Sequence, residues 1–256
     1  MHNQVNRVGY QEDKERGVSV TQPPTGARTA VLLPGTGSDD VFVRSVFDVP
    51  LAAVGLKAVL PTPLPGTDLV SAHLAALDEA AREEPIIAGG ISLGAHLAAE
   101  WALRNPDRCA GLLLALPGWH GKPEAAPAAV AARYSAASVR SLGPTAAIAA
   151  AVADVPVWLA TELTRAWTGY GDALADSLDT AADRPAPTLE DLATLTIPCG
   201  VAGCRDDAIH PLEVATAWSR ALPQAALCTT RLDIIGVDPE ALGRATVLAW
   251  LKASQG

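Results

Sequence analysis

Short apolar runs alternate with amphipathic segments along most of the chain. Five runs are apolar at most positions, which is typical of strands buried on both faces: 29–33, 57–60, 86–91, 111–116 and 197–202. Apolar residues recur instead at helical spacing over 67–84, 212–222 and 240–251, and a last strand is expected over 225–235. Strands that alternate with helices predict an α/β fold, with a mostly parallel central sheet covered by helices on both faces.

The alternation stops in the middle of the chain, where several helices are expected without a strand between them. We therefore predict a core of residues 1–117 and 188–256, and a helical cap, 118–187, inserted over the edge of the sheet. One helix of the cap carries its apolar and aromatic residues on a single face: Val155, Trp158, Leu159, Leu163, Ala166, Trp167 and Tyr170. That face either lines an apolar acyl pocket or packs the cap against itself and the core. Residues 1–28 are expected to form an edge hairpin or an arm, with a short strand at 18–20.

The strand at 86–91 runs directly into Gly90-Ile91-Ser92-Leu93-Gly94, which fits the G-x-S-x-G pattern of a nucleophile elbow. In such an elbow a strand turns sharply into a helix, and the glycines permit the two backbones to approach closely. The serine Oγ then projects above the edge of the sheet, near the free N–H groups of the helix N-terminus. The pattern alone also fits an ordinary glycine-rich loop, but here a strand precedes it and an apolar helix follows it. Ser92 is therefore a candidate nucleophile.

A glycine-rich loop, Pro34-Gly35-Thr36-Gly37-Ser38, follows the first buried strand. It has three interpretations: a plain turn, a phosphate-binding loop, or a loop that offers a backbone N–H to an oxyanion. A phosphate-binding P-loop requires a lysine that this loop lacks. Beside an elbow serine, an oxyanion hole fits best, and its second donor is the N–H of Leu93, the residue after the serine.

Two aspartates follow the strand at 197–202, in Gly203-Cys204-Arg205-Asp206-Asp207-Ala208-Ile209-His210-Pro211. Open α/β sheets build their sites at the carboxyl ends of their strands, which is where this loop lies. Helix capping would explain one aspartate and solvent exposure the other. The two aspartates therefore indicate a catalytic acid only in combination with the order of the other motifs along the chain.

A strand, a glycine-rich loop, a serine elbow, a cap, and then a strand, an acid and a helix follow one another over nearly the whole chain. This order resembles the α/β-hydrolase fold superfamily of serine hydrolases. The resemblance implies that Ser92 is the nucleophile and Asp207 the acid, with Asp206 as the less favoured neighbour. It also implies that the N–H groups of Thr36 and Leu93 bind the oxyanion. We expect no metal and no other cofactor.

The sequence departs from the family at the histidine. In the family the catalytic histidine follows the last strand, but residues 232–239 contain none. His120 lies beyond the strand that follows the elbow helix, at the carboxyl edge of the sheet, and we expect it to be the base. His210, beside the acid, is the alternative, and a site without a working base is the third possibility. His73 and His96 lie on apolar helix faces, where we expect packing roles.

Composition and charge narrow the range of partners. The chain has a formal net charge of −9 and no cluster of Lys or Arg, which argues against nucleic acid and anionic membranes. No apolar run reaches the roughly 18 residues of a membrane span, and no signal peptide is visible, so we expect a cytoplasmic protein. The four cysteines lack the close pairing of zinc sites or disulfide frameworks and are expected to be small buried hydrophobes.

Two classes of function remain. In the first, Ser92 attacks a small-molecule ester or thioester with an apolar acyl part, and a displaced histidine oriented by Asp207 moves the proton. In the second, the protein is a catalytically inactive member of the fold that binds a small apolar ligand or a protein partner. The distance from a histidine ring nitrogen to Ser92 Oγ distinguishes the two classes. Residues 232–239 are expected to reach the site without contributing a base.

Overall fold

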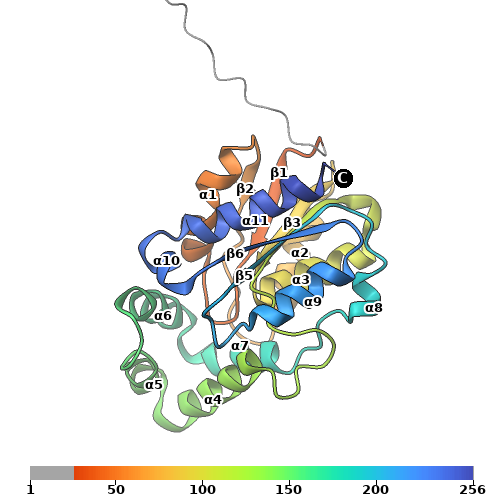
Figure 1. Ribbon diagram of the computed structural model, residues 1–256. Coiled ribbons are helices and arrows are strands. Elements are labelled where there is room, and N and C mark those ends of the chain that lie inside the picture. Colours follow the sequence, from red (N-terminus) through yellow and green to blue (C-terminus); the bar gives the residue numbers. More distant parts are fainter. Residues whose placement is uncertain (1–25, 256) are drawn as a thin grey trace, which may run out of the picture.

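The structure, a computed structural model, describes residues 26–255 (Figure 1). Six parallel strands form one sheet in the order β2-β1-β3-β4-β5-β6. They are β1 (Thr29–Leu33), β2 (Lys57–Val59), β3 (Ile86–Ile91), β4 (Cys109–Ala115), β5 (Cys199–Cys204) and β6 (Ala225–Thr230). The predicted α/β fold with a parallel sheet is confirmed. The strand expected at 18–20 lies outside the described residues.

Helices cover both faces of this sheet (Figure 1). One face carries α1 (Asp40–Ala52) and α11 (Glu240–Ala253), and the other carries α2 (Leu69–Ala80), α3 (Leu93–Arg104) and α9 (Leu212–Ala221). Alternate residues of a strand point to opposite faces. In β4, Leu112 and Leu114 join the apolar cluster that includes Trp101 and Trp218, whereas Leu113 joins the cluster that includes Trp250. Two cores therefore explain why the strands are apolar at consecutive positions.

Between β4 and β5 the chain forms helices and no strand. They are α4 (Pro127–Leu142), α5 (Pro144–Ala151), α6 (Val157–Tyr170), the 3-10 turn η2 (Gly171–Ala173), α7 (Leu174–Ala182) and the short α8 (Leu189–Leu192); another 3-10 turn, η1 (Pro106–Arg108), precedes β4. Helices α4 to α7 lie together beside one end of the sheet (Figure 1). Arg140 joins α4 to α7 through ion pairs with Asp176 and Asp179. The exact division into core and cap stays a prediction.

Within residues 26–255, no helix is both long and apolar enough to cross a membrane.

The prediction of a strand over 225–235 is wrong in its second half. Strand β6 ends at Thr230, and the chain continues as α10 (Leu232–Val237). The carboxylate of Asp206 accepts the N–H of Leu232 at 2.7 Å and also pairs with Arg231 at 3.3 Å. A carboxylate at a helix N-terminus accepts a free N–H and interacts favourably with the positive end of the helix dipole. The start of this helix therefore depends on a tertiary contact from another loop. The local pattern of apolar residues gives no sign of that contact.

Candidate active site

Ser92 occupies a strained turn between β3 and α3. Its backbone has φ 53° and ψ −112°, in a region that residues with a Cβ rarely adopt. The two flanking glycines are required by close backbone contacts. A Cβ at Gly90 would lie 2.4 Å from the carbonyl oxygen of Leu33, and a Cβ at Gly94 would lie 2.2 Å from the same oxygen. The predicted elbow geometry is confirmed.

His210 is hydrogen-bonded to Ser92 on one side and to Asp207 on the other. Its Nε2 lies 2.9 Å from Ser92 Oγ, and its Nδ1 lies 2.9 Å from Asp207 Oδ2. An ionised carboxylate can only accept a hydrogen bond, so the proton lies on His210 Nδ1, which donates to Asp207 Oδ2. In the neutral ring Nε2 is then the acceptor for the Ser92 hydroxyl. This is the arrangement that activates a serine as a nucleophile.

Asp207 holds both the ring and the backbone of His210. Its Oδ1 accepts the backbone N–H groups of Ile209 at 2.8 Å and of His210 at 3.1 Å, while Oδ2 accepts the ring Nδ1–H of His210. Burial alone would raise the pKa of Asp207, but the His210 ring and these two N–H groups lower it below its ordinary value. The carboxylate is therefore ionised at neutral pH. Asp206 points instead to Leu232 at the start of α10, so Asp207 is the aspartate that faces the site.

The structure does not bring His120 to Ser92, where the sequence analysis expected a base; the ring nitrogen beside Ser92 Oγ belongs to His210. His120 is exposed and is not among the residues that line the cavity at Ser92. The reason lies in the two residues before it. The N–H groups of Gly118 and Trp119 donate to His96 Nε2 at 3.0 and 3.4 Å, and the Trp119 carbonyl accepts from the Trp218 indole at 3.1 Å. With Trp119 fixed inward, the next side chain points outward.

His96 and His73 have the packing roles expected of them. His96 packs against Trp119 and Trp218, with ring centroids 4.6 and 5.5 Å away. Burial, and to a lesser degree the charge of His210, lowers the pKa of His96 to about 3. Burial lowers the pKa of His73 to about 4. Both rings are neutral near pH 7, so neither is a charged group of the site.

His210 was only the alternative base in the sequence analysis, and a local signal existed that favoured it. Asp207 and His210 are three residues apart before Pro211. An aspartate often accepts backbone N–H groups two or three residues ahead, which forms a tight turn. Such a turn brings the side chain at the third position next to the carboxylate. The candidate acid and the ring beside Ser92 therefore come from one loop of this chain.

The loop of residues 34–39 lies directly beside Ser92, and we call it the oxyanion loop after the role expected of it. A Cβ at Gly35 would lie 3.4 Å from Ser92 Cβ, so the backbone passes close to the serine. Thr36 lines the same cavity as Ser92. Within residues 26–255, the N–H groups of Thr36 and Leu93 donate to no other backbone group. These positions suit the two donors expected of an oxyanion hole, and that role stays a prediction.

A cavity of about 510 Å³ leads to Ser92 and His210. Most of its wall is apolar, and the predicted aromatic face of α6 contributes Trp158, Leu159, Leu163, Ala166 and Trp167. Helix α10 contributes Leu232 and Ile235, so the segment after β6 reaches the site without a base, as expected. Among the described lining residues there is no Lys or Arg, and Glu162 is the only carboxylate besides Asp207. The cavity is thus suited to an uncharged, apolar group.

Comparisons by sequence and by structure give different results. No family model and no curated protein sequence matches the chain. A solved esterase from Thermogutta terrifontis, in contrast, superposes with a TM-score of 0.67 at 20% identity, over 92% of each chain. The chain has the α/β-hydrolase fold. The structure of MenH from S. aureus has a TM-score of 0.67 at 14% identity and covers 92% of this chain and 96% of its own. The enol-lactonase from Burkholderia xenovorans has a TM-score of 0.60 at 18% identity, with 88% and 91% covered.

Proposed function

We propose that this protein is a serine hydrolase that cleaves a small, uncharged ester or thioester with an apolar acyl part. The observation that carries the proposal is the continuous set of hydrogen bonds from Ser92 Oγ through His210 to Asp207. The names of the similar structures, an esterase and an enol-lactonase among them, agree with ester cleavage. The sequence left open a site without a working base, and the position of His210 argues against that alternative.

The chemistry follows from the atoms at the site. His210 Nε2 accepts the Ser92 proton as Oγ adds to the substrate carbonyl carbon, and Asp207 stabilises the imidazolium that forms. The N–H groups of Thr36 and Leu93 bind the negative carbonyl oxygen. His210 then gives its proton to the departing alcohol or thiol, which leaves an acyl-serine. Water attacks this acyl group with His210 again as base, and the carboxylic acid and free Ser92 are the products.

The charge pattern of the cavity supports an uncharged acyl group. An acyl chain with its own carboxylate would lie on an apolar wall whose described residues include no lysine or arginine to pair with. An unpaired charge in such a place loses its hydration without compensation. p-Nitrophenyl butyrate and the p-nitrophenyl monoester of succinic acid have acyl chains of equal length and differ in that charge. We expect the butyrate to be cleaved at least about tenfold faster in kcat/KM, since about 1.4 kcal/mol corresponds to one factor of ten.

The test of the proposal combines fluorophosphonate labelling with hydrolysis of p-nitrophenyl esters. We expect the wild type to label and to hydrolyse the esters. Ser92→Ala and His210→Ala should each lower kcat/KM by about 10⁴-fold or more, because members of a triad act as a unit. His120→Ala is the matched control, since it removes an exposed histidine and should retain wild-type activity.

Two results would contradict the proposal. A wild type that neither labels nor hydrolyses any ester would leave the alternative of an inactive protein that binds a small apolar ligand. Loss of activity in His120→Ala with full activity in His210→Ala would show that the active protein uses a different base from the one proposed.

A further inference from the structure

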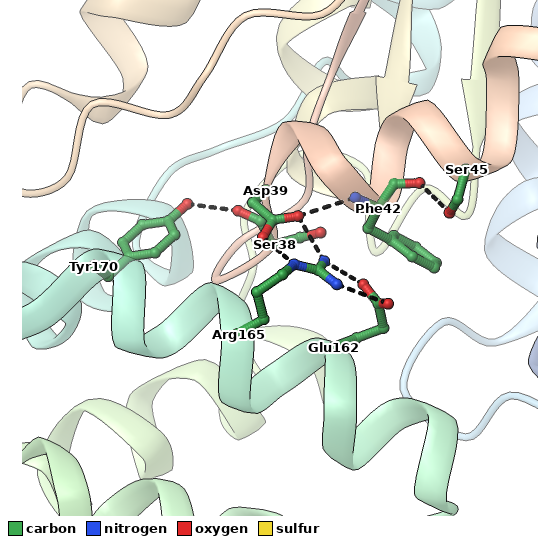
Figure 2. A network of polar contacts seen from close by, with 7 residues as sticks. All are labelled: Ser38, Asp39, Phe42, Ser45, Glu162, Arg165 and Tyr170. Atoms are coloured by element: carbon green, nitrogen blue, oxygen red, sulfur yellow. Dashed lines mark hydrogen bonds and ion pairs between the residues drawn. The ribbon is translucent and has the colours of Figure 1, made fainter.

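Helix α6 contacts the oxyanion loop at three successive residues (Figure 2 shows two of the contacts). The Tyr170 hydroxyl donates to the carbonyl oxygen of Ser38 at 2.9 Å. Trp167 packs on Gly37, where a Cβ would lie 2.8 Å from the indole Nε1. The guanidinium of Arg165 donates to both carboxylate oxygens of Asp39, at 2.8 Å each. The inserted helices thus bind the loop that carries the Thr36 N–H.

The contact between Arg165 and Asp39 is the strongest of the three by its chemistry. It is a bidentate, charge-assisted pair, which fixes direction as well as distance. Asp39 is mostly buried, with 16% of its side chain exposed, and Arg165 is 34% exposed. Burial raises the pKa of Asp39, but Arg165 and the backbone N–H of Phe42 outweigh this effect and lower it. The hydrogen bonds to Glu162 and Asp39 raise the pKa of Arg165, so the pair is fully charged at neutral pH.

Asp39 also connects the loop to α1. Its Oδ1 accepts the N–H of Phe42 at 2.9 Å and caps the first turn of that helix. The oxyanion loop is therefore held at its far end by one carboxylate with two partners, the α1 backbone and the α6 guanidinium. Arg165 also pairs with Glu162 on its own helix, which orients the guanidinium toward Asp39 (Figure 2). Within the described residues, none of these groups is hydrogen-bonded to Ser92 or His210.

We infer that Arg165 is a positioning residue for the proposed hydrolysis: through Asp39 it holds the oxyanion loop in the place where Thr36 N–H meets the developing oxyanion. The inference rests on the proposed function. An oxyanion donor must lie within hydrogen-bond reach of the transition state, and a displacement of about 1 Å can cost a hundredfold in rate. Arg165 is not among the residues that line the cavity, so its loss should affect the rate of the chemical step more than substrate binding.

The experiment measures kcat and KM for p-nitrophenyl butyrate in Arg165→Gln and Asp39→Asn. Asparagine also caps helices well, so Asp39→Asn removes the charge and keeps the α1 cap. We expect kcat to fall about tenfold or more in each variant, with KM within about twofold of the wild type. The double variant should be no slower than the slower single variant, because both changes break the same interaction.

Arg140→Gln is the matched control. Arg140 pairs with two carboxylates, as Arg165 does, but both belong to α7 and neither touches the oxyanion loop. Arg140→Gln should therefore keep the wild-type kcat. An equal fall of kcat in this variant, a change in KM alone in Arg165→Gln, or no change in Arg165→Gln would each overturn the inference. If Arg165→Gln does not fold, Asp39→Asn decides the matter.

Amide hydrogen exchange over residues 35–42 separates this inference from the proposed function. We expect faster exchange there in Arg165→Gln than in Arg140→Gln or the wild type, whether or not the protein cleaves esters. An inactive wild type with faster exchange in Arg165→Gln would refute the proposed function and retain the structural role of the pair. Unchanged exchange would refute the positioning role of Arg165 itself.

Discussion

Alanine in place of Gly94 tests the close contact that holds Ser92 in its strained turn. A Cβ at this position would lie 2.2 Å from the carbonyl oxygen of Leu33 and 2.9 Å from that of Pro34. Both atoms belong to the backbone, so no side-chain rotation relieves the clash. Ordinary contacts between such atoms are about 3.5 Å, and β1 and α3 must therefore move apart by about 1 Å. The elbow and the oxyanion loop both lie at this junction.

The expected cost follows from two opposing terms. Extra atoms in a close-packed core cost about 1–3 kcal/mol, and a clash with rigid backbone belongs at the upper end. Replacing glycine with alanine in a helix contributes up to about 1 kcal/mol in the other direction. We expect a net loss of about 2 kcal/mol in the free energy of unfolding. For a chain of this size that loss lowers Tm by about 4–8 °C.

Gly169 provides the control for this variant. It lies in α6, and a Cβ there would meet nothing within 4 Å. Gly169→Ala should gain about 0.5–1 kcal/mol from reduced backbone freedom in the unfolded chain. Thermal unfolding compares the two variants, and fluorophosphonate labelling reports whether Ser92 keeps its geometry. If Gly94→Ala were as stable as Gly169→Ala and labelled at the wild-type rate, the close approach of β1 and α3 would not be what fixes the elbow.

Two further predictions concern buried groups. Burial lowers the pKa of His73 from 6.5 to about 4, so between those values the unfolded chain binds more protons and stability falls with falling pH. At pH 5 this lowers the free energy of unfolding by about 2 kcal/mol. Urea unfolding at pH 7 and pH 5 should show a smaller fall in His73→Leu than in the wild type, and an equal fall in both proteins would contradict the prediction. Burial raises the pKa of Cys109 to about 11 and, with the nearby aspartates, that of Cys204 to about 12, and Cys199 is also buried. Only the partly exposed Cys228 should therefore react quickly with a thiol reagent in the folded protein, and rapid reaction at a second cysteine would count against this packing.

The sheet and the elbow could be predicted because their determinants are local. Strands buried on both faces require consecutive apolar residues, and the turn at Ser92 requires glycines where two backbones meet. Both the consecutive apolar residues and the glycines beside Ser92 can be read within a few positions of the sequence. The apolar face of α6 could be predicted for the same reason, since its period is that of one helix.

Features that depend on contacts between distant segments could not be predicted in this way. His120 turns outward because His96, in helix α3, accepts the N–H groups of the two residues before it. Helix α10 forms after β6 because Asp206, from a neighbouring loop, accepts the N–H of Leu232. The pair between Arg165 and Asp39 joins residues that are 126 positions apart. In each case the sequence shows the residues, but only the fold brings them together.

The placement of His210 in the same turn as Asp207 has a consequence for the rest of the site. In the family pattern the segment after the last strand must carry a histidine to the serine, which fixes its length and direction. Here His210 and Asp207 come from one turn, and that segment is free of this requirement. It forms α10, whose Leu232 and Ile235 face the cavity. In the proposed mechanism, the position of His210 leaves this segment free to line the cavity with apolar residues, which agrees with the apolar acyl group of the proposed substrate.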